Sequence, residues 1–159
     1  MEPLAKLFGS NARLKTLRLF VFNQDTAFTP AEVIERVKLS KEVTRHELDE
    51  LCTSGLLRKK RAHPPAGKNN AFVRYQVNPR FEYLAALNVF IRETTSVRPR
   101  AIIEALRRAG TLQLVALSGF FTGVLESQID LLVVGDHLEE RALAQAVHSL
   151  ETELGREIR

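Results

Sequence analysis

The spacing of apolar residues in the first half of the chain predicts several helices and a pair of strands. In four segments, apolar side chains recur every three to four residues, the spacing that gives a helix one buried face. Residues 72–77 instead alternate and are β-branched or aromatic, which is typical of a strand. The predicted helices span 10–25, 29–38, 41–54 and 81–93. A basic run at 57–61 and the strand at 72–77 flank a turn-rich tip, so a hairpin over 57–77 is expected.

Two of these helices carry clear start and stop signals. The run TPAE at 29–32 has the sequence of a capping box, in which the Thr29 hydroxyl accepts from the Glu32 N–H and the Glu32 side chain reaches back. Ser40 is the next N-cap candidate, and Gly55 supplies the left-handed residue that commonly ends a helix. The very short turn between the two helices predicts a helix-turn-helix.

After a linker at 94–99, the second half of the chain alternates between helices and apolar strands. Helices are expected at 101–109 and 137–154. The nearly continuous apolar runs at 112–117 and 129–134, the second interrupted only by Asp130, predict buried strands. A further strand is expected to begin at 157–159. Together the two halves predict an α+β chain, with helices and a hairpin first and a small α/β domain with a central sheet second.

The two halves of the chain also differ in net charge. The net charge is +4, but residues 1–80 contain 15 Lys and Arg against 8 Asp and Glu, whereas residues 81–159 contain 8 against 11. No lysine follows Lys68. We therefore expect a basic domain at 1–80, a connecting helix and linker at 81–98, and a mildly acidic domain at 99–159. A basic domain of this kind favours a polyanionic partner.

The basic residues gather where a helix-turn-helix and a following hairpin would meet DNA. The second helix of such a motif presents its N-terminal turns to base edges, and hairpin cations contact phosphates or the minor groove. The candidates on the helix are Ser40, Lys41, Thr44, Arg45 and His46. Those on the hairpin are Arg58, Lys59, Lys60, Arg61, Lys68 and Arg74. We expect Ser40 or Thr44 to contact a phosphate or cap the helix; the alternative for the whole set is a solvated charged surface.

Residues 39–57, LSKEVTRHELDELCTSGLL, resemble the helix-turn-helix of winged transcriptional regulators of the ArsR and MarR type. The resemblance implies double-stranded DNA as partner, helix 41–54 in the major groove, and a homodimer on palindromic sites. The chain departs from the pattern at Thr44, where such regulators carry an aliphatic residue. A small rotation of the helix that turns Val43 inward is expected to compensate.

Residues 117–134 resemble the minimal nucleotidyltransferase fold. Active members hold nucleotide phosphates with a Gly-Ser loop and bind Mg²⁺ with an Asp-x-Asp pair. Here the loop order is Ser118-Gly119, and Gln128 stands at the first carboxylate position, which leaves only Asp130. The resemblance therefore implies a domain without catalytic residues, metal or cofactor, in which Ser118, Gly119 and Asp130 are a vestigial nucleotide site. Asp130 is alternatively a structural carboxylate that caps a loop.

Other classes of protein fit the sequence less well. One cysteine, Cys52, cannot form an internal disulfide, and the four histidines show no zinc-site spacing. No apolar run approaches the about 18 residues that cross a bilayer, and the N-terminus lacks the layout of a signal peptide, so a cytoplasmic protein with no membrane partner is expected.

Three functions remain open from the sequence. The first is a DNA-binding transcriptional regulator whose second domain dimerises or senses a nucleotide or protein effector. The second is an active nucleotidyltransferase that modifies a protein or RNA. The third is a protein–protein adaptor whose winged helix has lost its affinity for DNA.

Overall fold

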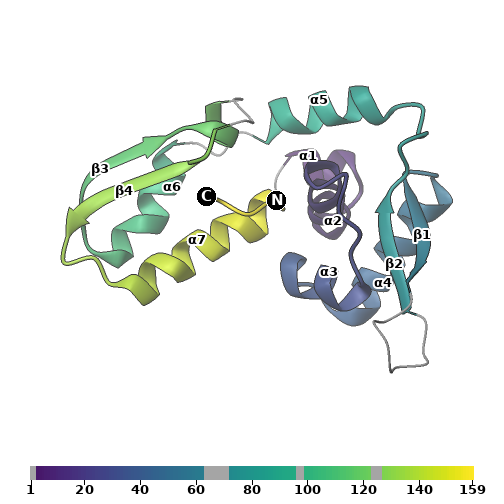
Figure 1. Ribbon diagram of the computed structural model, residues 1–159, viewed down its shortest axis with the longest axis horizontal. Coiled ribbons are helices and arrows are strands. Elements are labelled where there is room, and N and C mark those ends of the chain that lie inside the picture. Colours follow the sequence, from purple (N-terminus) through teal and green to yellow (C-terminus); the bar gives the residue numbers. More distant parts are fainter. Residues whose placement is uncertain (1–2, 63–71, 96–98, 123–126) are drawn as a thin grey trace. The chain divides into compact units, whose positions relative to one another are not determined.

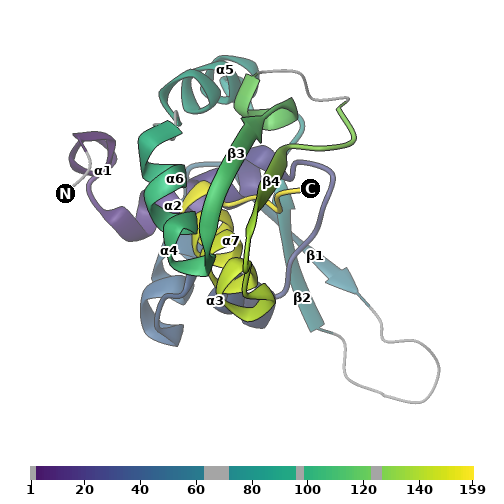
Figure 2. The same cartoon turned by 90° about the vertical axis from the view of Figure 1, so that its left-hand side faces the viewer.

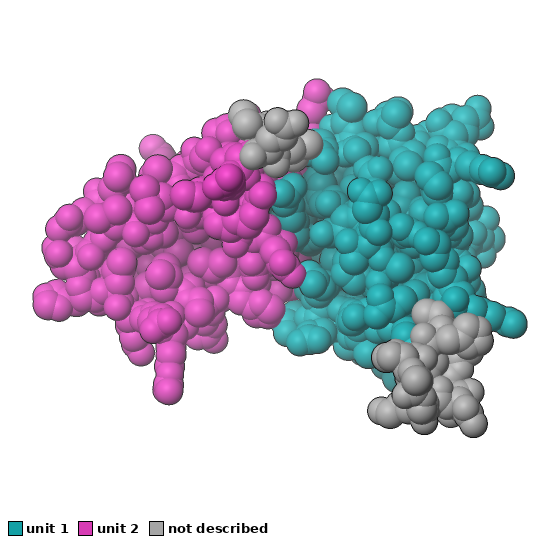
Figure 3. All heavy atoms as spheres, in the orientation of Figure 1, with its two compact units in different colours: residues 1–92, 154–156 teal, residues 93–153, 157–159 magenta. Residues whose placement is uncertain are grey.

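A computed structural model describes residues 3–62, 72–95, 99–122 and 127–159, which combine helices and strands. The chain forms two compact units, shown in different colours in Figure 3. Unit 1 comprises Met1–Arg92 and Leu154–Arg156, and unit 2 comprises Glu93–Glu153 and Glu157–Arg159. Each unit is considered by itself below.

Unit 1 contains the helices and the hairpin expected in the first half (Figure 1). Its elements are α1 (Pro3–Leu7), α2 (Asn11–Phe22), α3 (Pro30–Val37), α4 (Lys41–Thr53), β1 (Leu57–Ala62), β2 (Phe72–Val77) and α5 (Leu84–Thr94, of which the last residues belong to unit 2). The short helix α1 was not predicted, and α5 begins three residues later than the apolar spacing suggested. The tip of the hairpin lies outside the described residues.

The helix caps confirm the local signals of the sequence. Thr29 Oγ1 accepts a hydrogen bond from the Glu32 N–H at 3.3 Å, and Glu32 Oε2 accepts one from the Thr29 N–H at 2.6 Å. At the start of α4, Ser40 Oγ accepts from the Val43 N–H at 3.3 Å. Gly55 has a φ of 82°, the left-handed conformation that ends α4. Thr29 thus starts α3, Ser40 starts α4 directly after the short turn, and Gly55 ends α4.

The core of unit 1 lies between the helices and the hairpin. The largest contributors from α2, α3 and α4 are buried apolar side chains at Leu14, Leu17, Phe20, Val21, Val33, Val37, Leu48 and Leu51. The strands β1 and β2 are antiparallel, with Leu57 opposite Val77 and Ala62 opposite Phe72. Phe28, just before α3, exchanges two backbone hydrogen bonds with Tyr75 of β2, at 2.8 and 2.7 Å. The hairpin is therefore fastened to the segment that leads into α3.

A buried carboxylate also ties α4 to the start of α2. Glu47 on α4 is almost fully buried, and its carboxylate accepts from the Arg13 guanidinium and, at 3.1 Å, from the Ser10 hydroxyl. Ser10 is itself the N-cap of α2, where its oxygen accepts from the Arg13 N–H at 2.9 Å. This interaction was not predicted, although Glu47 lies three residues after Thr44 and beside Leu48 on the inward face of the helix.

The expected rotation of α4 is wrong. Thr44 is fully buried, as an aliphatic residue would be at that position, and Val43 is exposed. The helix keeps the usual orientation because Leu48, Leu51 and Glu47 all lie on the side that includes Thr44. The Thr44 hydroxyl makes no hydrogen bond in the described part of the chain.

Unit 2 is one antiparallel strand pair covered by helices on one face. Its elements are α6 (Pro99–Leu106), the 3₁₀ turn η1 (Arg107–Ala109), β3 (Thr111–Leu117), the 3₁₀ turn η2 (Gly119–Thr122), β4 (Leu131–Asp136) and α7 (Glu140–Leu154). Thr111 lies opposite Asp136 and Leu117 opposite Leu131, with an irregularity between Leu112 and Leu114. Ile102, Leu106 and Leu150 form the buried centre, against which the inward side chains of the strands pack. Figure 2 shows β3 and β4 in front of α6 and α7.

Two expectations for the second half are wrong. The strands were expected to be buried, but burial alternates along both, and Leu114, Leu132 and Val134 are exposed. The reason is that helices pack against only one face in the described residues of this unit. Residues 157–159 form no strand; instead, the Arg159 carbonyl accepts from the backbone N–H groups of Asp130 and Leu131 at 2.6 and 3.1 Å.

Replacement of Glu47 by glutamine should destabilise unit 1. The change leaves the Arg13 guanidinium without its buried anion, and breaking one side of a buried, hydrogen-bonded charge pair should cost about 2–3 kcal/mol here, because Arg13 stays partly exposed. Urea unfolding followed by tyrosine fluorescence measures this unit, since both tyrosines, Tyr75 and Tyr83, belong to it.

Glu50→Gln is the matched control for that measurement. Glu50 lies 3.6 Å from the same guanidinium but its side chain is about half exposed, so its loss should cost less than about 1 kcal/mol. Equal losses in the two variants would show that burial of Glu47 does not anchor α4.

Candidate nucleic-acid interface

The exposed face of α4 is a single stripe of polar side chains. Lys41, Glu42, Arg45, His46 and Asp49 line a shallow hollow on this face. Their spacing places them on one side of the helix, whereas Thr44, Glu47, Leu48 and Leu51 are buried on the other side. The N-terminal half of the stripe thus presents two cations, one histidine and one carboxylate to solvent.

Two of the cations on α4 have no internal partner. Among the described residues, Lys41 and Arg45 make no hydrogen bond or ion pair. They lie four residues apart and therefore one turn apart on the helix surface. Long cationic side chains without internal partners are suited to phosphate oxygens and to guanine base edges.

Lys59, by contrast, forms an ion pair and a cation–π contact within the protein. Its Nζ lies 2.9 Å from Asp49 Oδ1 and 5.7 Å from the centre of the Tyr75 ring. The hydrogen bond to Asp49 raises the pKa of Lys59. This pair neutralises the acidic end of the α4 stripe, so Lys59 screens a carboxylate that would otherwise repel a phosphate.

Some of the remaining basic residues of the hairpin form hydrogen bonds or ion pairs within unit 1, and others do not. Arg58 donates to Gln76 Oε1 at 3.3 Å, and Arg74 donates to the Ala27 carbonyl at 3.1 Å. Arg74 also lies 3.6 Å from a Glu32 oxygen and stacks over the Phe72 ring at 5.4 Å. Within the described ranges, Lys60 and Arg61 have no such partner. Lys68 lies outside the described residues.

The pKa of the Glu32 carboxyl is lowered in this arrangement. The main cause is the hydrogen bond from the Thr29 backbone N–H, and the positive charge of Arg74 adds to it. Glu32 thus stays ionised, caps α3 and holds Arg74 of the hairpin at the same time.

Two predicted contact residues on α4 have other roles in the structure. Ser40 is exposed and serves as the N-cap, one of the two roles expected for it. Thr44 was expected to contact a phosphate or take part in the cap, and the structure contradicts both, because its side chain is fully buried among the helices of unit 1. Its position in the inward repeat with Leu48 and Leu51 is the signal that could have shown this.

An apolar groove lies beside the α4 stripe and was not foreseen. It is lined by Thr29, Pro30, Ala31 and Ile34 from α3 and its cap, Lys41, Arg45 and Leu48 from α4, and Phe72, Val73 and Tyr75 from β2. The groove joins residues that are far apart in sequence, so its existence depends on how the hairpin docks against α3. Burial raises the pKa of the Tyr75 hydroxyl, which keeps this side chain neutral.

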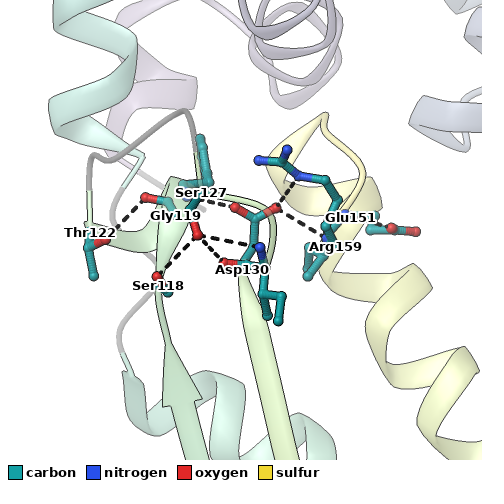
Figure 4. A network of polar contacts seen from close by, with 10 residues as sticks. Ser118, Gly119, Thr122, Ser127, Asp130, Glu151 and Arg159 are labelled. Atoms are coloured by element: carbon teal, nitrogen blue, oxygen red, sulfur yellow. Dashed lines mark hydrogen bonds and ion pairs between the residues drawn. The ribbon is translucent and has the colours of Figure 1, made fainter.

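The three residues of the predicted nucleotide site in unit 2 do lie together (Figure 4). The Ser118 N–H donates to the Asp130 carbonyl at 2.9 Å. The Asp130 side chain is buried; one oxygen accepts from the Phe120 N–H at 2.8 Å, and the other accepts from the N–H and Nε of Arg159, each at 3.1 Å. Both oxygens are thus bonded within the protein.

Gly119 is required by this arrangement. It has a φ of 53°, and a Cβ at this position would lie 2.1 Å from Asp130 Oδ1. Burial by itself would raise the pKa of the Asp130 carboxyl, but the hydrogen bonds from Phe120 and Arg159 outweigh burial and hold that pKa below its usual value. Asp130 therefore caps the η2 turn, the structural alternative considered for it.

The described residues contain no group of three His, Cys, Asp or Glu side chains placed to hold a metal ion. Within the same residues, every helix is too short or too polar to cross a membrane. No family model, curated protein or solved structure matches this chain.

Thr44→Val should stabilise unit 1. The change removes a buried hydroxyl that lacks a hydrogen-bond partner and keeps the shape of the side chain, for an expected gain of about 1 kcal/mol. Thr53→Val, on the exposed side of α4, is the control and should give no gain. Urea unfolding tests both; equal effects of the two substitutions would contradict the burial of an unpaired hydroxyl at Thr44.

Asp130→Asn should destabilise unit 2 in a pH-dependent way. The folded pKa of Asp130 is depressed, so its contribution is present above the unfolded pKa of about 3.9 and is lost as the pH falls through the lower folded value. We expect a loss of about 1–3 kcal/mol at pH 7 that shrinks below about pH 4.

Amide hydrogen exchange in β4 measures this loss at pH 7, and urea unfolding followed by circular dichroism compares pH 7 with pH 3. Asp136→Asn, an exposed carboxylate on the same strand, is the control and should change little. A pH-independent loss in Asp130→Asn would contradict the assignment of an ionised capping role.

Proposed function

We propose that unit 1 is the winged-helix DNA-binding domain of a cytoplasmic transcriptional regulator. In this proposal α4 enters the major groove of duplex DNA, and the β1–β2 hairpin is the wing that contacts the backbone or the minor groove. The observation that carries it is that four exposed cations of α4 and β1, Lys41, Arg45, Lys60 and Arg61, make no hydrogen bond or ion pair with the described residues.

The arrangement of charges supports the division of roles between helix and hairpin. Arg45 and Lys41 lie on the exposed face of α4. The opposite face of the helix is held by the buried contact between Glu47 and Arg13. A rigid helix with a defined exposed face is suited to base readout, where geometry decides affinity. The hairpin offers Lys60 and Arg61 on opposite faces of β1, which suits separate phosphate contacts along a strand.

We further propose that unit 2 supplies dimerisation or the sensing of a nucleotide or protein effector, not catalysis. The resemblance of residues 117–134 to nucleotidyltransferases supports a nucleotide as one effector. Gln128 stands where those enzymes carry a metal-binding carboxylate, and the two oxygens of Asp130 are bonded to the η2 turn and to Arg159. A homodimer would read a palindromic site, with two copies of α4 in successive major grooves.

Selection from a random duplex library, followed by sequencing, tests the proposal with the whole chain. We expect one enriched motif, and Arg45→Ala should lower affinity for it by about 1–3 kcal/mol and relax its specificity at one position. Arg108→Ala, an exposed arginine of unit 2, is the control and should leave both unchanged. If no motif is enriched at low salt, the proposal fails and a protein-binding adaptor becomes the better reading.

A salt titration on the enriched site tests the role of the hairpin. If three to five phosphates are neutralised per protomer, log K should fall against log salt with a slope of about −3 to −4.5. Replacement of both Lys60 and Arg61 by alanine should reduce the magnitude of that slope by about 2 for each protomer while the preferred sequence stays the same. An altered motif with an unchanged slope would show that the hairpin reads bases instead.

A further inference from the structure

The groove between α3, α4 and β2 in unit 1 combines an apolar floor with a cationic rim. Leu48 and Tyr75 are buried at its base, and Ile34 and Val73 form its walls. The hydroxyl of Thr29, at its edge, is occupied in the capping box of α3. The surface that a ligand would enter is therefore largely hydrocarbon.

Among the described residues that line the groove, the charged ones are cations and none is a carboxylate. Lys41 and Arg45 line the groove, and neither forms an ion pair with any described residue. Arg61 lies directly opposite Val73 in the β1–β2 pair, so it extends from the same face of the hairpin. The neighbouring hollow on α4 differs, because Glu42 and Asp49 are part of its lining. The groove is thus the more positive of the two surfaces.

A ligand that matches this groove presents an apolar group inward and negative charge on either side of it. In the major groove of duplex DNA, the 5-methyl group of thymine is the apolar feature of the base edges, and phosphates flank it. RNA offers uracil without this methyl group, and its deep, narrow major groove does not admit side chains. The chemistry of the groove therefore favours DNA over RNA.

We propose that this groove receives the 5-methyl group of a thymine in the target DNA, so that the protein selects sites with a thymine at a fixed position. The inference rests on the proposed DNA-binding function. Lys41 and Arg45 line both the α4 stripe and the groove. A DNA strand held by these two side chains consequently lies over the groove, and this favours DNA over an acidic amphipathic peptide as its occupant.

Replacement of thymine by deoxyuridine, one position at a time, tests the inference on the enriched duplex. Binding of the whole chain is measured by fluorescence anisotropy. At one thymine per half-site we expect the loss of the methyl group to weaken binding about fourfold, the fold-change that corresponds to burial of one methylene-sized group. The other thymines should tolerate the replacement with less than about a twofold change.

Two matched valines locate the methyl-binding site on the protein. Val73 in the groove is 39% exposed, and Val43 on α4, outside the groove, is 40% exposed. Val73→Ser should abolish the fourfold preference for thymine over deoxyuridine, and Val43→Ser should retain it. A wild-type thermal transition in both variants confirms that they fold.

A second pair of variants keeps the test decisive if Val73→Ser fails to fold. Ala31 lines the groove in the first turn of α3, where an aspartate is favourable to the helix. Ala31→Asp should weaken DNA binding at least tenfold because it adds a negative charge beside the bound strand, and the neutral Ala31→Asn should weaken it less than threefold. Equal effects of the two would overturn the placement of DNA over the groove.

The outcomes separate this inference from the proposed function. An enriched site that tolerates deoxyuridine at every position would overturn the inference and leave the DNA-binding function standing. Failure to enrich any duplex would overturn both. A thymine preference that persists in Val73→Ser and in Ala31→Asp would show that the methyl group is read elsewhere on the protein and would also overturn the inference.

Discussion

The buried contact between Glu47 and Arg13 is the constraint on which the candidate interface depends. Because Glu47 lies on the inward side of α4 and bonds both Arg13 and the Ser10 cap of α2, it fixes the rotation of α4 about its own axis. That rotation decides which side chains reach solvent. Lys41 and Arg45 are presented outward because Thr44, Glu47 and Leu48 are held inward. A helix free to turn would offer no fixed pattern of charges to a base pair.

Internal pairing of carboxylates with cations also determines the charge of the candidate interface. Glu47 is committed to Arg13, Asp49 to Lys59 and Glu32 to Arg74. These three carboxylates are therefore paired within unit 1, whereas Lys41, Arg45, Lys60 and Arg61 make no ion pair among the described residues. The basic character of the face that we assign to DNA follows from this distribution more than from the net charge of +4. On the proposed function, substitutions that release one of these carboxylates add an unpaired negative charge near the phosphates and should weaken binding even when the cations are untouched.

Features that depend only on residues close together in the chain were predicted correctly from the sequence. The capping box at Thr29, the cap at Ser40 and the left-handed Gly55 are local, and each lies where it was predicted. The errors concern features that depend on distant residues. The inward position of Thr44 depends on packing against α2, and the one-sided burial of β3 and β4 depends on how many layers cover the sheet. The apolar groove joins α3, α4 and β2, and only docking of the hairpin brings these elements together.

Unit 2 shows that a carboxylate at the position of a metal ligand does not by itself indicate metal binding or catalysis. Asp130 is buried beside Gly119, at the place where a resemblance to nucleotidyltransferases suggests a metal ligand. The Asp130 carboxylate is fully buried and accepts hydrogen bonds from Phe120 and Arg159, so it is not exposed to an ion from solvent. The same carboxylate cannot cap the turn and ligate an ion with the same lone pairs. Asp130 in unit 2, like Glu47, Asp49 and Glu32 in unit 1, is bonded within the fold, and among the described residues Lys41, Arg45, Lys60 and Arg61 remain as cations free to bind a partner.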